Sequence, residues 1–141
     1  MTDAELVAKK LGLIEAYVHD LRTLGRPDDL ATDIREQRFT LHTLQLAAQA
    51  ALDVASHIVS DDRLGEPETG RDLFGLLARH GWIEGELAAR LEDMAGFRNV
   101  LVHEYVALDL QRVVDALDEL DPLERFLEIV VEMESGEGRV S

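Results

Sequence analysis

Apolar residues recur along this chain at intervals of three and four positions, which is the spacing of one face of an α-helix. The pattern predicts helices over residues 4–24, 32–60, 70–80, 84–105 and about 109–133. Glycines that favour helix ends follow two of these ranges, at Gly25 and Gly81. Residues 61–69 contain Gly65 and Pro67 and are predicted to form a loop.

The last predicted helix contains Pro122, which has no backbone N–H to donate. We therefore expect a kink or an interruption near Asp121. Together the predicted helices make an all-α fold, an up-and-down helical bundle of four to five helices. A length of 141 residues suits one domain with its own core, which we place at residues 1–134. Residues 135–141 are Gly-rich and polar, and we expect them to form a disordered tail.

The composition excludes several classes of protein. The chain has no cysteine, which rules out a disulfide framework, a thiolate zinc site and a cysteine nucleophile. No stretch approaches about 18 consecutive apolar residues, and the first residues are acidic. Both features argue against a membrane span or a signal peptide, so we expect a cytoplasmic protein.

The formal net charge is −15, and it is distributed unevenly. Residues 113–141 hold nine carboxylates and two arginines, a net charge of −7. This balance argues against a broad basic surface that coats nucleic acid. A local positive cleft around Arg98 stays open, and RNA binding there should be weak and salt-sensitive. The acidic surface also suits a basic protein partner.

One helical stripe in the fourth predicted helix carries a charge among apolar residues. Steps of four and three place six residues on it: Leu87, Leu91, Met94, Arg98, Leu101 and Tyr105. Four of the six are apolar, as a core-facing stripe requires, but the guanidinium of Arg98 cannot lose its charge. Burying it without a partner is very unfavourable. Arg98 must therefore pair with an anion, line a cleft, sit at a subunit contact or extend its head group to water.

Asn99 and His103 lie four residues apart on a neighbouring stripe of the same helix. Within two turns the helix thus carries a permanent cation, an amide, a titratable imidazole and the phenol of Tyr105. A packed or surface histidine and an ordinary core tyrosine are the alternatives to a functional site here.

Asp53 and His57 form a second candidate pair, one turn apart in the second predicted helix. They could hydrogen-bond to one another and support the Arg98 site. A local pair that only stabilises a packed helix is favoured over catalysis. A metal site is less favoured still, because no third ligand is evident nearby.

Two stretches of the sequence carry a family resemblance. The first is Arg-x4-His-x-Tyr over Arg98–Tyr105, preceded by Met94-Ala95-Gly96-Phe97. The second runs from Leu44-Gln45-Leu46-Ala47 through Leu52–Ile58. Over roughly residues 4–133 the chain resembles the HepT branch of the HEPN superfamily. The resemblance implies a HEPN-like bundle that forms a two-fold homodimer, with two copies of the motif across a cleft.

The same resemblance implies the toxin of a type II/VII-like toxin–antitoxin pair, a metal-independent endoribonuclease that needs no cofactor. Its RNA substrate would be cut by attack of the 2′-hydroxyl on the adjacent phosphorus. His103 suits a base, Arg98 matches the charge that gathers on phosphoryl oxygens, and Asn99 could orient either group. The implied antitoxin is an MNT-type nucleotidyltransferase that adds AMP to Tyr105.

Two alternatives to the enzyme follow from the same residues. A non-catalytic HEPN helical binding module could dock a nucleotidyltransferase or sense a nucleotide, and the negative charge favours it modestly. A structural helical-bundle dimer without a small ligand is the other. Replacing His103 separates the enzyme from the first, and replacing Arg98 separates it from the second.

Overall fold

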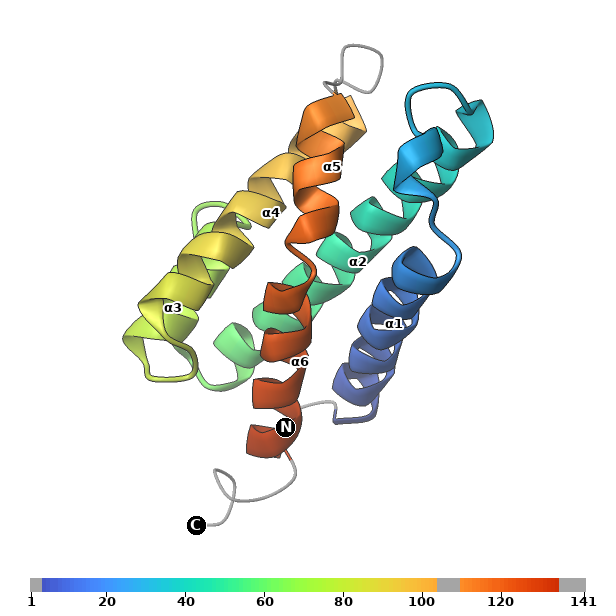
Figure 1. Cartoon of the computed structure of the whole chain (residues 1–141). Coiled ribbons are helices and arrows are strands. Elements are labelled where there is room, and N and C mark those ends of the chain that lie inside the picture. The colour runs from blue at the N-terminus through green and yellow to red at the C-terminus, as the bar shows by residue number, and fades with distance from the viewer. Residues whose placement is uncertain (1–3, 104–109, 135–141) are drawn as a thin grey trace.

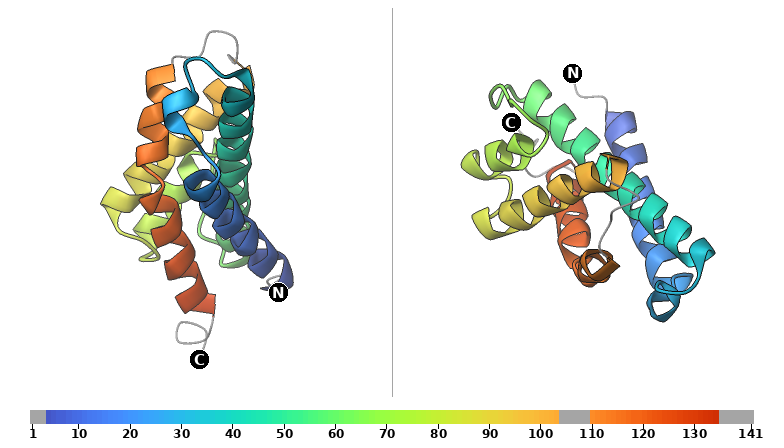
Figure 2. Two further views of the ribbon diagram at one scale, coloured as in Figure 1. Left: turned by 45° about the vertical axis from the view of Figure 1, so that its right-hand side comes forward. Right: turned by 90° about the horizontal axis from the view of Figure 1, so that it is seen from above.

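Four helices pack side by side into a bundle in the computed structural model (Figure 1). They are α1 (Ala4–Thr23), α2 (Ile34–Asp61), α4 (Gly85–His103) and α6 (Asp121–Glu134). Helix α1 contacts α2, α2 contacts α4, α4 contacts α6, and α6 contacts α1, so the four helices close around one core. Successive members run in opposite directions (Figures 1 and 2), which confirms the predicted up-and-down arrangement. The structure describes residues 4–103 and 110–134, and the side chains of residues 4–98 and 110–133.

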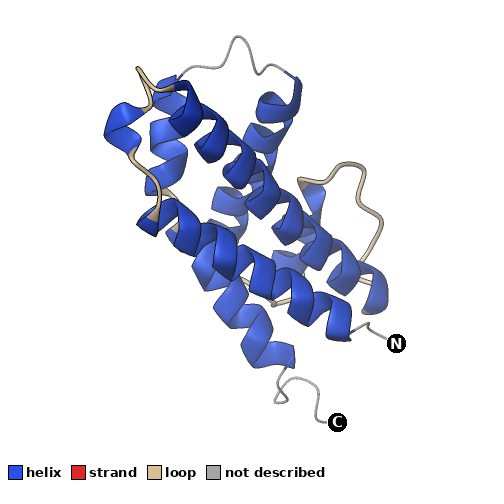
Figure 3. Ribbon diagram, turned by 90° about the vertical axis from the view of Figure 1, so that its right-hand side faces the viewer, coloured by secondary structure: helices blue, strands red, loops and turns tan. Residues whose placement is uncertain are grey.

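Two more α-helices and one short turn complete the described chain. Helix α3 (Asp72–Arg79) packs on α2 and α4, α5 (Leu110–Asp118) precedes α6, and the 3-10 turn η1 (Pro27–Asp29) follows α1. Every regular element within the described ranges is helical (Figure 3), as predicted. The tail at 135–141, expected to be disordered, lies outside those ranges.

The number of helices differs from the prediction of four to five, because six α-helices occur in the described residues. The difference arises where an interruption was expected, near Asp121. Helix α5 ends at Asp118 and α6 begins at Asp121, which leaves Pro122 in the first turn of α6. A first-turn residue donates no hydrogen bond within the helix, so proline is tolerated there. The chain therefore breaks into two helices instead of bending one.

Both predicted glycine stops are found, for different physical reasons. After α3, Gly81 has a φ of +81°, and hydrogen bonds run from Gly81 N–H to Ala78 and from Trp82 N–H to Leu77. This is the Schellman arrangement, which needs a left-handed residue. Gly25 has no positive φ, but a Cβ there would lie 2.4 Å from the carbonyl oxygen of Leu21. Close approach of the backbone, not handedness, requires glycine after α1.

The buried face of α2 is made largely of small residues. Alanines on that face, among them Ala48, Ala51 and Ala55, are fully or almost fully buried and allow other helices to approach closely. Phe74 of α3 and Phe126 of α6 meet edge to face in the core, with ring centroids 5.7 Å apart, and both side chains are completely buried.

Arg22 ties the end of α1 to the beginning of α6. Its guanidinium donates to Glu124 at 2.6 Å and to Asp121 at 2.7 Å. The hydrogen bond to Glu124, together with the one to Asp121, raises the pKa of Arg22 above its ordinary value. The two carboxylates also sit in the first turn of α6, where the helix dipole favours negative charge. Because the ion pairs of Arg22 are exposed to solvent, they add little to the free energy of unfolding and mainly fix the position of α6 relative to α1.

Within the described part of the chain, no helix combines the length and the apolar character needed to cross a membrane.

The aromatic pair leads to a prediction about stability. Replacing Phe74 with Ala should lower the free energy of unfolding by about 3–5 kcal/mol, because the ring is completely buried and its removal leaves a cavity. Urea denaturation followed by circular dichroism measures the change. Leu24→Ala is the matched control, because Leu24 is 61% exposed, and it should change the free energy by less than about 0.5 kcal/mol. Equal effects of the two substitutions would contradict this assignment of the core.

Candidate functional site

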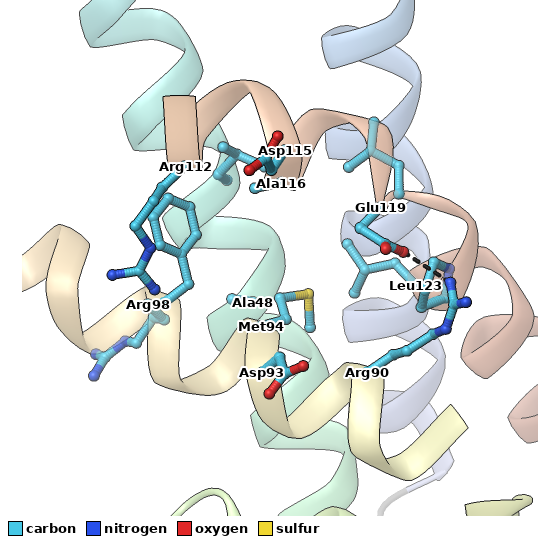
Figure 4. Close-up of a pocket in the computed structure, with 14 residues that line it drawn as sticks. Ala48, Arg90, Asp93, Met94, Arg98, Arg112, Asp115, Ala116, Glu119 and Leu123 are labelled. Atoms are coloured by element: carbon cyan, nitrogen blue, oxygen red, sulfur yellow. Dashed lines mark hydrogen bonds and ion pairs between the residues drawn. The ribbon is translucent and has the colours of Figure 1, made fainter. Parts of the chain in front are cut away.

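The stripe of α4 that contains Arg98 leaves the core as it approaches the motif. Leu87 and Leu91 are buried, whereas Met94 and Arg98 are half-buried. Met94 and Arg98 line a cavity of about 200 Å³ between α4, α2 and the α5–α6 segment (Figure 4). Arg98 thus lines a cleft, which is one of the alternatives open to it.

The cavity has an apolar interior and a charged rim. Its interior is lined by Leu44, Ala48, Met94, Phe97, Ala116, Leu120, Pro122 and Leu123, and its rim by Arg90, Asp93, Arg98, Arg112, Asp115 and Glu119. Most rim side chains are exposed, so the cavity opens to solvent between α4 and α5. A small apolar hollow with a few convergent polar groups is the usual form of a ligand site.

The charged side chains of the rim are distributed unevenly along it. At one end Arg90 is engaged by Glu119, with 2.9 Å between guanidinium nitrogen and carboxylate oxygen. Arg98 and Arg112 line the other end, toward the C-terminus of α4 (Figure 4). That end therefore carries two arginines on an acidic protein.

Arg112 is held over the ring of Phe97, with its guanidinium carbon 5.2 Å from the ring centroid. This cation–π contact joins the first turn of α5 to α4 beside Arg98. The helical pattern and the motif did not point to Arg112. A signal was present, because Arg112 is the only arginine or lysine between Arg98 and Arg125 in an otherwise acidic stretch.

The remaining motif residues can be placed only in part. Helix α4 is continuous through Asn99 to His103, which puts His103 about 7.5 Å along the axis and roughly 140° around it from Arg98. The side chains of Asn99 and His103 lie outside the described residues, as does all of Tyr105. Their roles stay predictions.

Asp53 and His57 are not brought to this cavity. Asp53 accepts a hydrogen bond from Gln49 at 2.9 Å and forms an ion pair with Lys10 of α1 at 3.0 Å. Both carboxylate oxygens are thus engaged away from His57, and neither residue lines the cavity beside Arg98. The contacts of Asp53 are those of a group that fastens α1 to α2.

Comparison with known proteins identifies the family. Residues 9–130 match the family model described as ribonuclease HepT-like. The chain is 30% identical over 128 residues to an mRNA nuclease HepT of Shewanella oneidensis, covering 89% of this chain and 96% of that one. It is 33% identical over 121 residues to a tRNA nuclease HepT of Aphanizomenon flos-aquae, covering 83% and 82% respectively.

A solved structure shares the fold. It contains a tri-AMPylated HEPN toxin of Shewanella oneidensis in complex with an MNT antitoxin, and its toxin aligns with a TM-score of 0.82 at 30% identity. The alignment covers 92% of this chain and 98% of that chain. With the family model spanning most of its length, this chain belongs to the HepT-like ribonuclease family.

Proposed function

We propose that this protein is the ribonuclease toxin of a toxin–antitoxin pair and that it cleaves RNA without a metal ion. The observation that carries the proposal is the course of α4, which runs without interruption from cavity-lining Arg98 to His103. Family membership supports it, and so do relatives described as mRNA and tRNA nucleases. Because the two relatives differ in substrate, the proposal extends to RNA as a class.

The chemistry needs only the groups of the motif and the nucleophile in RNA. The imidazole of His103 removes the proton of a ribose 2′-hydroxyl, whose oxygen then attacks the adjacent phosphorus. The bond from phosphorus to the 5′-oxygen breaks, and that oxygen takes up a proton. The products are a 2′,3′-cyclic phosphate and a 5′-hydroxyl. Arg98 donates to the phosphoryl oxygens as negative charge gathers on them.

His103→Ala should abolish cleavage. Removing a general base costs a factor of about 10² to 10⁴, so the rate should fall at least a hundredfold. The assay follows total RNA incubated in EDTA with the purified protein, with end analysis for cyclic phosphate. His19→Ala replaces an exposed histidine on α1 and should leave the rate unchanged. If wild type and both variants are equally inactive while folded, the non-catalytic binding module becomes the better account.

A two-fold dimer is part of the proposal, for a chemical reason. One imidazole cannot readily act as base and acid in the same step, and two chains would supply two copies of His103 and Arg98. Sedimentation equilibrium of the full chain should therefore give the mass of two protomers at the concentration used for the assay. A monomer that cleaves RNA at full rate would exclude the shared site.

We further propose that a nucleotidyltransferase antitoxin silences the toxin by adding AMP to Tyr105. The AMPylated HEPN toxin with its bound MNT antitoxin supports this for a relative 30% identical to this chain. The tyrosine oxygen would attack the α-phosphorus of ATP, its proton would pass to solvent, and pyrophosphate would leave. The added phosphate would compete with RNA for Arg98.

AMP should be added to Tyr105 and not to the other tyrosine of the chain. The chain contains only Tyr17 and Tyr105, so Tyr105→Phe should remove every AMP adduct, and Tyr17→Phe should remove none. Intact-mass spectrometry of protein co-expressed with the partner transferase measures the adducts. An adduct that survives in Tyr105→Phe would place the acceptor elsewhere.

A further inference from the structure

We propose that the cavity between α4 and α5 is a nucleotide subsite, in which Arg98 and Arg112 hold a phosphate and the apolar interior takes the adjoining base. The inference rests on the proposed ribonuclease function and names a part of its substrate site. It adds Arg112, which lies outside the Arg-x4-His-x-Tyr motif, to the groups that contact RNA.

Geometry supports the phosphate end. Arg98 and Arg112 come from different helices and line the same end of one cavity (Figure 4). The buried ring of Phe97 contacts one face of the guanidinium of Arg112. Stacking on a ring restrains the guanidinium while leaving its edge N–H groups for a ligand. Two planar donors that line one end of a cavity suit the oxygens of a phosphodiester.

The rest of the rim shows why Arg112 is singled out. Arg90, the third arginine of the cavity, is engaged by Glu119. The carboxylate of Asp115 accepts a hydrogen bond from Gln111 at 3.0 Å. Arg112 makes no ion pair within the described part of the chain. Its positive charge is thus not neutralised by a neighbouring carboxylate, and an anionic ligand could use it.

The interior fits a single base. A volume of about 200 Å³ lies below the roughly 300–1,000 Å³ of pockets that hold drug-sized ligands. One heterocyclic ring between Met94 and Leu123 would match the space and the apolar lining. Single-stranded RNA is bound in this way, with unstacked bases against apolar or aromatic side chains and phosphates on arginine. Asp93 at the rim could accept a hydrogen bond from an exocyclic amino group.

Methionine methyl NMR tests the base. The chain has three methionines; Met94 lines the cavity, and Met133 lies near the end of α6, outside the cavity. Titrating the full-length, methyl-labelled protein with cytidine 5′-monophosphate should shift the Met94 resonance through the ring current and leave Met133 unchanged. Inorganic phosphate should give a much smaller Met94 shift. A Met94 signal that responds equally to both, or to neither, would overturn the base site.

Salt dependence tests the phosphate contact. Binding of an uncleavable 2′-O-methyl RNA oligonucleotide should weaken about tenfold in Arg112→Ala. The slope of log affinity against log salt should fall by about 0.7, the value for one phosphate contact on a single strand. Arg112→Lys should keep the slope, because it keeps the charge. Arg125→Ala is the control, since Arg125 is exposed on α6 and lies outside this cavity, and it should match wild type.

The outcomes separate the subsite from the ribonuclease. If wild type cleaves RNA while Arg112→Ala matches it in cleavage and binding, the subsite is wrong and the ribonuclease proposal stands. If Met94 responds to the nucleotide but no RNA is cut, the subsite stands and the ribonuclease proposal fails. If Arg112→Ala instead changes the sedimentation mass, the cavity is covered by a second copy of the chain, and the subsite is wrong.

Discussion

Arg98, whose guanidinium cannot lose its charge, lies on the same helical stripe as core residues of α4. Leu87 and Leu91 of that stripe are buried, so the stripe must reach solvent before Arg98 or bury a charge at great cost. The bundle satisfies this constraint with a cavity beside Arg98, between α4, α2 and the α5–α6 segment. At Met94 and Arg98 the stripe borders this cavity. The position of the cavity, and with it the candidate site, follows from where the arginine falls on the helix.

The break between α5 and α6 forms the other wall of the cavity. Glu119, Leu120 and Pro122, which lie at the break, all line it. An unbroken helix would continue the packing of α6 on α4 past this level. Because the chain restarts at Asp121, α5 can take its own direction, and Arg112 reaches Phe97 from the far side. Proline in the first turn of α6 makes that restart favourable.

Positive and negative charges are distributed unevenly over this fold. A net charge of −15 should repel RNA from most of the surface, yet two arginines line one end of one cavity. Two other arginines are engaged by carboxylates: Arg22 by Asp121 and Glu124, and Arg90 by Glu119. Such an arrangement confines anion binding to a small site and leaves an acidic exterior for a protein partner. Affinity for RNA would be modest, and selectivity would depend on the site.

Local features of this protein were determined by the sequence alone. Helical periodicity predicted the bundle, Gly81 predicted the Schellman stop, and Pro122 predicted the interruption, because each depends on residues a few positions apart. Contacts between distant residues were decided only by the tertiary structure. Asp53 binds Lys10 of another helix instead of His57, and Arg112 joins Arg98 because helix packing brings α5 to α4. Spacing along one helix cannot reveal which side chains a neighbouring helix will supply.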